Sequence, residues 1–529
     1  MKKTGVMLDC SRNAVMSISG LKRFIDTLKI MGYNYVMLYT EDTYEVDGEP
    51  LFGYLRGRYT KAELREIDAY CAQREIELIP CIQTLAHLNQ IFQWGPYQSI
   101  RDVDDILLVG EDRTYILIEN MFRTLRSCVK TDLIHVGMDE AYLLGFGKYK
   151  DKNGIKPRAE ILIEHLKKVC VLAQKYDFKP MMWSDMFFSN AKEGEYGKEL
   201  IAQLPENLIL VDWNYEIQPI QKHEERLKKH LEMNHPVWFA SGALKWVGFS
   251  AAVPDAEQAL TNCLSACRNT GIENTLLTLW GDDGNETPVY AVLANIFFQS
   301  EFLRGNTDKK LIAEKFENTF GESWEDFYLF HLVFKDESLK KSPSSQGAKS
   351  MLYNDVFLGK FDSSVIGGGK EALEWATMAK KFHDAASRSK NYGYIFESYA
   401  CLCEVLELKH ELGVNTRNAY QFDRTKLPKI IEDYNETMLR LERFIVAFRR
   451  MWYTDNKPHG FDVQEARLGG LLLRLKSCRD RLQLLVNGKI EKIEELEERI
   501  LNYFDGTENL EKGVFGYNNY KVNVTVNRI

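Results

Sequence analysis

Residues 133–140 read Leu133-Ile134-His135-Val136-Gly137-Met138-Asp139-Glu140, a short apolar run that ends in two adjacent carboxylates. Similar runs of β-branched or apolar residues recur through the first 305 residues, and each is followed by an amphipathic helical stretch. The eight runs are Gly5–Cys10, Tyr33–Thr40, Ile76–Thr84, Leu133–Glu140, Pro180–Asp185, Leu208–Tyr215, Val237–Ser241 and Thr275–Trp280. Eight β/α units in one chain predict an α/β fold, a closed parallel (β/α)8 TIM barrel.

A doubly wound open sheet is the structural alternative to the barrel. Such a sheet usually carries a glycine-rich phosphate loop after its first strand. Here the first run leads into Asp9-Cys10-Ser11-Arg12-Asn13, which contains no glycine. The sequence therefore favours the barrel.

Three regions are predicted along the chain: a catalytic barrel in 1–305, a connecting region in 306–370 and a mainly helical C-terminal domain in 371–529. Turn-forming residues interrupt the connecting region at 341–345 and 367–369. Apolar residues at three-to-four spacing predict helices near 371–387, 392–412, 425–452, 461–486 and 488–503. Residues 520–526 alternate like a strand whose partner lies elsewhere in the protein or in a second copy.

Composition argues against several classes of partner. The chain has 68 Lys plus Arg against 76 Asp plus Glu, a net charge of -8, and no long basic run, so we expect no nucleic acid partner. The first residues are too polar for a signal peptide, and no stretch reaches membrane-spanning length. We therefore expect a cytoplasmic protein without a membrane partner.

The ten cysteines are scattered and form no C-x-x-C pair, which predicts reduced core residues. Cys263 and Cys267 have helical i, i+4 spacing, but no histidine lies nearby in the sequence. A buried helix face therefore explains this pair better than a metal site does. We expect neither a metal nor a cofactor.

The residues that close the eight runs are rich in carboxylates and aromatic rings, and in such barrels the active site lies at the carboxyl ends of the strands. The set includes Asp9, Arg12, Tyr39, Glu41, Asp42, Gln83, His87, Asp139, Glu140, Trp183, Asp185, Asp212, Trp213, Tyr215, Lys245, Trp246, Trp280, Asp282 and Asp283. Rings stack on the C–H faces of a sugar while carboxylates bind its hydroxyls, so this rim predicts a carbohydrate site. Large rings that fill the taper of the barrel are the alternative for any single tryptophan.

Asp139 and Glu140 are the strongest local signal for chemistry. If both enter one pocket, their repulsion keeps one protonated near neutral pH, which yields a general acid beside an ionised carboxylate. Strand alternation places the two on opposite faces, so a joint role requires the chain to bend, and Gly137 makes that bend easier. An acidic cap of the next helix, or a solvated pair, is the alternative.

The pattern His135-x-Gly137-x-Asp139-Glu140 resembles the end of the fourth barrel strand in glycoside hydrolase family 20, the β-N-acetylhexosaminidases. Residues 8–12 look like the Leu-Asp-x-Ser-Arg segment of the family, which implies that Arg12 binds ring hydroxyls of the terminal sugar. Asp42 and His87 are placed like the relay to the general acid. Residues 280–282 resemble the Trp-x-Glu that ends strand eight, with Asp282 in place of glutamate. The resemblance covers about residues 1–305 and points to the intracellular bacterial-type branch without an N-terminal α/β domain.

The resemblance implies a retaining, substrate-assisted hydrolysis that releases terminal β-linked N-acetylhexosamines. The 2-acetamido oxygen attacks the anomeric carbon, and neighbouring carboxylates on one strand suit this better than a separate acid and nucleophile. In this reading Asp139 orients the acetamido group, Glu140 is the general acid and base, and Tyr215 holds the acetamido oxygen. The pocket walls are then Trp183, Trp213 and Trp280, and Trp246 contacts the aglycone side or closes the rim. The family's Tyr-x-Asp after a middle strand is absent, because Glu216 and Ile217 follow Tyr215.

Two rival functions stay open at this point. One is a two-carboxylate glycosidase on sugars without an acetamido group, pairing Glu140 with Asp185 or Asp282. The other is a barrel that binds glycans without cleaving them, with the helical domain as an assembly platform. A purely structural role is the alternative for two of these residues. His87 is then a buried histidine that stabilises the fold, and Arg12 forms a structural ion pair with Asp9. The long helical domain favours a homodimer.

Overall fold

The computed structural model describes residues 2–188, 190–192, 195–246, 248–334 and 347–501. Eight parallel strands close into a barrel in sequence order, with β1 paired to both β2 and β8. The strands are β1 (Thr4–Asp9), β2 (Tyr35–Tyr39), β3 (Glu77–Cys81), β4 (Leu133–His135), β5 (Lys179–Trp183), β6 (Ile209–Trp213), β7 (Val237–Gly242) and β8 (Thr275–Leu279). The predicted TIM barrel is confirmed.

Strand alternation divides the barrel residues between two apolar cores. Val6 and Leu8 of β1 face outward into the core shared with the helices, whereas Met7 faces the barrel interior. Trp183 is part of the interior core, and Trp213 and Trp280 pack over it. The barrel core is therefore roofed by aromatic rings at the carboxyl ends of the strands.

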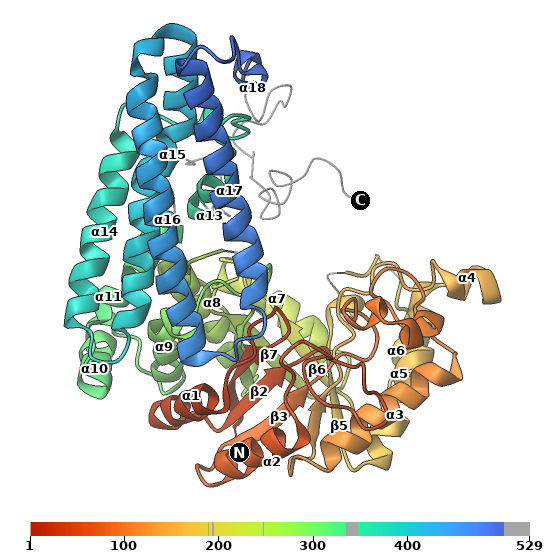
Figure 1. Cartoon of the computed structure of the whole chain (residues 1–529). Coiled ribbons are helices and arrows are strands. Elements are labelled where there is room, and N and C mark those ends of the chain that lie inside the picture. The colour runs from red at the N-terminus through yellow and green to blue at the C-terminus, as the bar shows by residue number, and fades with distance from the viewer. Residues whose placement is uncertain (1, 189, 193–194, 247, 335–346, 502–529) are drawn as a thin grey trace.

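Helices follow the strands around the barrel (Figure 1). They are α1 (Ile18–Met31), α2 (Lys61–Ala72), α3 (Asp112–Arg126), α4 (Lys148–Asn153), α5 (Arg158–Lys175), α6 (Lys198–Ile201), α7 (Ile220–Leu231), α8 (Val253–Thr270) and α9 (Leu293–Leu303). Helix α2 begins with a capping box in which Thr60 and Glu63 satisfy each other's backbone N–H groups. Helix α1 begins at a Ser17 cap and ends at Gly32, which adopts the left-handed conformation.

The C-terminal part of the chain is mainly helical, as predicted. Short helices lie in the predicted connecting region, and long ones form an antiparallel array that rises beside the barrel (Figure 1). They are α10 (Lys309–Phe320), α11 (Trp324–Tyr328), α12 (Phe330–Phe334), α13 (Gly347–Tyr353), α14 (Lys370–Arg388), α15 (Gly393–Phe422), α16 (Leu427–Asp455), α17 (Phe461–Val486) and α18 (Glu494–Glu497). The region boundaries at 305 and 370 stay predictions, and the strand predicted at 520–526 lies outside the described residues.

One predicted helix differs from the structure. The segment near 488–503 is predicted to be helical, but in its described part, residues 488–501, only α18 is, and Gly488 adopts a left-handed conformation. The Arg417 guanidinium donates to the carbonyl oxygens of Leu496 and Glu498 at 3.0 and 2.8 Å. A tertiary contact thus satisfies carbonyl groups that a longer helix would bind internally.

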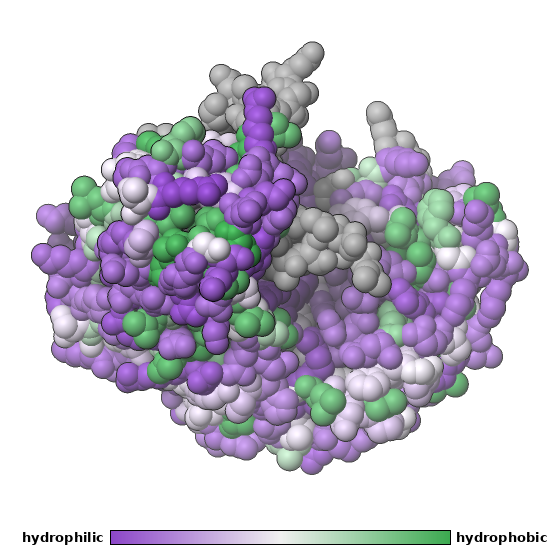
Figure 2. All heavy atoms as spheres, turned by 45° about the horizontal axis from the view of Figure 1, so that its top comes forward, coloured by the Kyte–Doolittle hydropathy of each residue, from purple (hydrophilic) through white to green (hydrophobic). Residues whose placement is uncertain are grey.

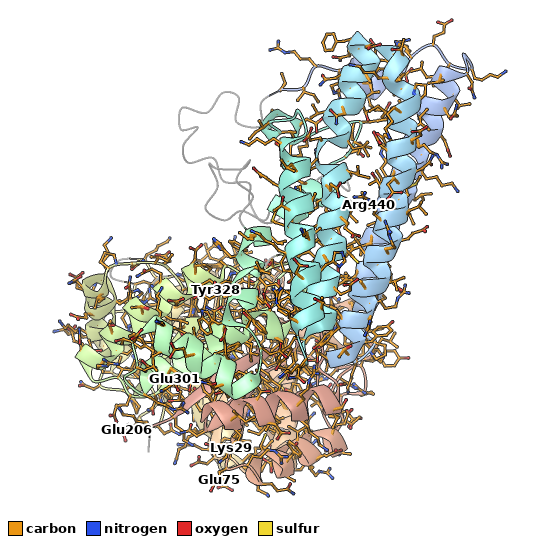
Figure 3. The ribbon with its side chains drawn as sticks, turned by 90° about the vertical axis from the view of Figure 1, so that its left-hand side faces the viewer. Lys29, Glu75, Glu206, Glu301, Tyr328 and Arg440 are labelled. Atoms are coloured by element: carbon orange, nitrogen blue, oxygen red, sulfur yellow. The ribbon has the colours of Figure 1, made fainter. Side chains whose placement is uncertain are left out.

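The helical array is anchored to the rim that carries the carboxyl ends of the strands. The Ser17 N–H donates to the Asp455 carbonyl oxygen at 2.9 Å, and the Asp455 carboxylate pairs with Arg23 of α1. A side view (Figure 3) places Lys29 and Glu75, an ion pair at 2.5 Å, at the opposite end of the barrel, with Arg440 far up the array. The face seen in Figure 2 is hollowed between the array and the barrel loops. No helix of the described residues is both long and apolar enough to cross a membrane.

Candidate active site

A cavity of about 200 Å³ opens at the carboxyl ends of the strands. It is lined by Arg12, His87, Asp139, Glu140, Trp183, Trp213, Tyr215, Trp246, Trp280 and Asp282. These side chains come from the last residues of seven of the eight strands, β1 and β3 to β8, or from the loops that follow them. The structure thus brings together all the predicted site residues except Asp42.

The chain bends where β4 ends, as a joint role for the two carboxylates requires. The strand stops at His135, and Gly137, Met138 and Glu140 take positive φ angles of 74°, 71° and 53°. Such angles are uncommon for residues other than glycine and mark a backbone held by its surroundings. A Cβ at Gly137 would collide with the Gln83 side-chain amide. The bend turns Asp139 and Glu140 into the same pocket.

Asp139 is held as an ionised carboxylate. Burial acts to raise its pKa, but the His87 imidazole 3.2 Å away and the Gln83 amide, which donates to Oδ1 at 2.7 Å, outweigh it and lower the pKa. The same Gln83 nitrogen lies 2.9 Å from the Tyr39 hydroxyl. Asp139 is therefore an oriented acceptor with one oxygen on His87 and the other on Gln83.

Glu140 has the opposite electrostatic environment. Burial and the nearby Asp139 charge raise its pKa. Its side chain is 39% exposed, against 11% for Asp139, and it accepts a hydrogen bond of 3.1 Å from the Tyr142 hydroxyl. A carboxyl group with a raised pKa at the open side of a pocket is suited to proton transfer.

His87 is placed beside both carboxylates, but its further partner differs from the expectation. The imidazole Nδ1 of His87 lies 3.8 Å from the Asp105 carboxylate. The same carboxylate accepts a hydrogen bond of 3.0 Å from the backbone N–H of His87. Asp42 instead pairs with Arg56 at 3.4 Å and does not line the cavity. The carboxylate that contacts His87 from the β3–α3 loop is thus Asp105, where the resemblance implied Asp42.

The walls of the cavity are aromatic. Trp213 stacks on Tyr215 with ring centroids 5.3 Å apart, and Trp246 meets Tyr215 edge-on at 5.0 Å. Trp183 and Trp280 lie 6.0 Å apart. The Trp280 indole N–H donates to the Tyr215 hydroxyl at 2.8 Å, and the Tyr215 side chain lines the cavity.

Arg12 is surrounded by three carboxylates. Its guanidinium lies 3.4 Å from Asp9, 3.3 Å from Glu41 and 3.7 Å from Asp282. Asp9 also accepts the Gly281 N–H at 2.9 Å and is fully buried. Arg12 both pairs with Asp9 and lines the cavity together with Asp282. A structural ion pair with Asp9 is therefore compatible with a role of Arg12 in binding hydroxyl groups.

Several residues that shape the site were not among the site residues implied by the family resemblance, although Asp185 was considered as the second carboxylate of the rival glycosidase. Glu41, Gln83, Asp185 and Lys245 were in the census of strand ends, whereas Asp105 was not. Asp185 is fully buried and accepts the Glu140 N–H at 3.0 Å, and burial together with the Asp139 charge raises its pKa to about 7. Lys245 donates to Asn285 at 2.7 Å, and burial lowers its pKa to about 8. Asp105 carries no pattern that marks it in the sequence.

Asp185 does not line the cavity and accepts the Glu140 backbone N–H instead, which disfavours it as the second carboxylate of a two-carboxylate site. Asp282 does line the cavity, but it lies beside Arg12. Within the part of the chain that the structure describes, no cluster of His, Cys, Asp and Glu could hold a metal ion.

Similarities to known proteins extend over most of the chain. The family model of the glycosyl hydrolase family 20 catalytic domain matches residues 4–244, and that of the Glycoside Hydrolase 20C C-terminal domain matches residues 329–515. Hexosaminidase D of Homo sapiens is 23% identical over 290 residues, which cover 51% of this chain and 58% of that protein. Hexosaminidase D of Bos taurus is 22% identical over 287 residues, covering 51% of this chain and 82% of that protein.

Among solved structures, the β-N-acetylhexosaminidase from Bacteroides fragilis matches with a TM-score of 0.49 and 19% identity over 62% of this chain and 73% of that chain. The matched region spans only somewhat more than half of human hexosaminidase D. The catalytic and C-terminal models nevertheless match two consecutive parts of one chain. The protein belongs to glycoside hydrolase family 20.

Proposed function

We propose that the protein is an exo-acting β-N-acetylhexosaminidase that removes terminal, non-reducing β-linked N-acetylglucosamine or N-acetylgalactosamine. The observation that carries this proposal is the pair of adjacent carboxylates in one cavity, with the pKa of Asp139 lowered and that of Glu140 raised. Membership of the hexosaminidase family supports the same reaction.

The first step forms an oxazolinium ion from the substrate itself. The 2-acetamido oxygen attacks the anomeric carbon as the glycosidic C–O bond breaks, and Glu140 gives its proton to the leaving oxygen. Asp139 accepts the acetamido N–H and stabilises the positive charge that develops. Tyr215 donates to the acetamido oxygen and holds it in line for attack.

In the second step, water opens the oxazolinium ring. Glu140, now ionised, takes a proton from the incoming water, whose oxygen bonds to the anomeric carbon as the acetamido group is restored. Two inversions at one carbon give overall retention, so the released sugar is the β-anomer.

The shape of the site favours the end of a glycan chain. Trp183 is buried beneath the cavity, so the pocket has a closed floor. Arg12 and Asp282 lie on one side of it and offer a donor and an acceptor to ring hydroxyls. Trp246 lines the same cavity, and we assign it to the aglycone side.

The test uses aryl N-acetyl-β-glucosaminide, aryl N-acetyl-β-galactosaminide and aryl β-glucoside, with the released anomer followed by NMR. We expect cleavage of the N-acetyl substrates alone, with the β-anomer formed first. Robust cleavage of the glucoside would favour the two-carboxylate glycosidase. Binding of N-acetylhexosamine without any turnover would favour the non-catalytic glycan-binding barrel.

Location in the cytoplasm is a further proposal. All ten cysteines are free and buried, and burial raises the pKa of several of the thiols, Cys71, Cys170 and Cys401 among them. Reduced core cysteines are typical of a reducing compartment. Cell fractionation tests the proposal, and recovery of the protein outside the cytoplasm would contradict it.

A further inference from the structure

Helix α16 carries an apolar stripe on the outside of the molecule. Leu439, Val446 and Tyr453 are spaced seven residues apart, and 56%, 63% and 46% of their surfaces are exposed. Seven-residue spacing places side chains on one face of a helix, as in the contact seam of a coiled coil. The stripe therefore runs for two heptads along the outer face of the helix.

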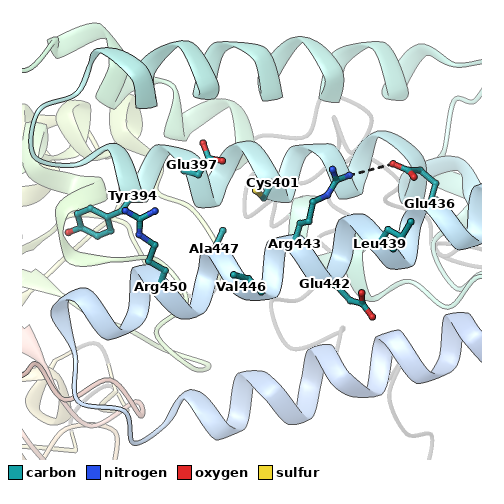
Figure 4. A pocket seen from close by; sticks show the side chains of 10 residues that line it. All are labelled: Tyr394, Glu397, Cys401, Glu436, Leu439, Glu442, Arg443, Val446, Ala447 and Arg450. Atoms are coloured by element: carbon teal, nitrogen blue, oxygen red, sulfur yellow. Dashed lines mark hydrogen bonds and ion pairs between the residues drawn. The ribbon is translucent and has the colours of Figure 1, made fainter.

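A furrow lies beside this stripe. Between α15 and α16 there is a hollow of about 640 Å³, lined on one side by Tyr394 and Cys401 and on the other by Val446 and Ala447 (Figure 4). An exposed apolar ridge next to a furrow has the shape of a helix-docking surface.

Two charged residues flank the stripe symmetrically. Glu442 precedes Val446 by four residues and Arg450 follows it by four, and neither forms an ion pair with any residue in the described ranges. Their neighbours are different, because Arg443 pairs with Glu436 at 3.4 Å and Arg449 with Glu465 at 2.6 Å. The stripe thus presents one negative and one positive group at equal distances from its centre.

We propose that this face of α16 is the interface of a homodimer, in which the two α16 helices pack antiparallel about a two-fold axis at Val446. That arrangement sets Glu442 opposite Arg450 of the partner subunit and, by symmetry, Arg450 opposite Glu442 of the partner subunit. Leu439 then meets Tyr453 of the partner subunit. A surface that complements itself in both charge and apolar pattern fits a second copy of this chain.

The first experiment measures mass by light scattering on the full chain. The wild type is expected at twice the chain mass of 61.3 kDa, and Val446→Glu at the mass of one chain. Leu473→Glu is the matched control, because Leu473 is 65% exposed on α17, outside the stripe, and should leave the dimer intact. A monomeric wild type, or a dimer broken by Leu473→Glu and not by Val446→Glu, would overturn the proposal.

The second experiment swaps the charges. Glu442→Arg and Arg450→Glu should each raise the dimer Kd at least about tenfold, since each places like charges together twice across the axis. The double variant restores opposite charges in both copies and should return the Kd close to the wild-type value. A double variant as weak as the single ones, with unchanged circular dichroism, would contradict the antiparallel register.

Discussion

The Nε2 atom of His87 lies 3.2 Å from Oδ2 of Asp139. Burial acts to lower the His87 pKa, but the Asp139 charge outweighs it and raises the pKa to about 10. The two groups therefore form an ion pair at neutral pH, while Glu140, 3.7 Å from the same nitrogen, keeps a raised pKa. One histidine thus helps to separate the protonation states of two neighbouring carboxyl groups.

Replacing His87 by glutamine should shift the pH dependence of kcat/KM. Asp139 acts when ionised, and His87 depresses its pKa, so loss of the positive charge should move the acid limb to higher pH by about one unit. We also expect kcat/KM to fall about 10-fold to 100-fold. His383→Gln, on the exposed side of α14, is the control. An unchanged acid limb in His87→Gln would show that the ion pair does not set the ionisation of Asp139.

Replacing Tyr215 by phenylalanine removes the hydroxyl that we assign to the acetamido oxygen. The ring contacts with Trp213 and Trp246 stay, so the fold should be unaffected. The lost donor should reduce kcat about 100-fold on an aryl N-acetyl-β-glucosaminide. Circular dichroism checks the fold, and a kcat within twofold of the wild type would remove Tyr215 from the mechanism.

Asp185 should make stability depend on pH. Burial raises its pKa from 3.8 to about 7 in the fold, so its ionisation costs stability progressively as the pH rises from about 4 to 7. Asp185→Asn should match the wild type near pH 4 and exceed it at pH 8, by at most about 4 kcal/mol. Urea unfolding at both pH values measures the difference. A gain that is the same at pH 4 and pH 8 would contradict a buried, titrating carboxyl group.

Arg467 of α17 should position the loop after β8 that brings Asp282 to the cavity. Its guanidinium donates to the Asp283 carbonyl oxygen at 2.7 Å and to Glu286 at 3.0 Å, next to Asp282 in the cavity. Arg467→Met should lower kcat/KM at least about tenfold, chiefly through KM. Arg474→Met on the same helix, which loses the pair with Asp355, should leave KM unchanged. Equal effects of the two variants would indicate a general loss of stability.

The barrel could be predicted because its signal is local. Each strand is a short apolar run followed by a helical pattern, and the observed strands lie within the predicted runs or extend at most one residue beyond them. The end of β4 was harder, because residues 136–140 look extended in sequence and are bent by contacts with Gln83 and Asp185. The helix predicted at 488–503 failed for the same reason, since Arg417 binds its carbonyl groups from another helix.

The residues of the candidate site that lie at or just after strand ends, such as Asp139 and Trp280, could be predicted from the sequence. The relay partner of His87 could not, because Asp105 lies in the loop after β3 and reaches the histidine only through the path of that loop. Asp42 follows β2 directly but turns to Arg56, a pairing that no spacing in the sequence indicates. Contacts between distant loops are fixed by the tertiary structure.

The most direct test of the account compares Asp139→Ala and Glu140→Ala with the wild type on aryl N-acetyl-β-glucosaminides that carry either a good or a poor leaving group. We expect Asp139→Ala to lose activity on both substrates, because the charge of the oxazolinium ion is no longer stabilised. Glu140→Ala should lose much more activity on the poor leaving group, which needs the acid. Full activity in either variant, or equal losses of Glu140→Ala on both substrates, would contradict the roles assigned to the two carboxylates.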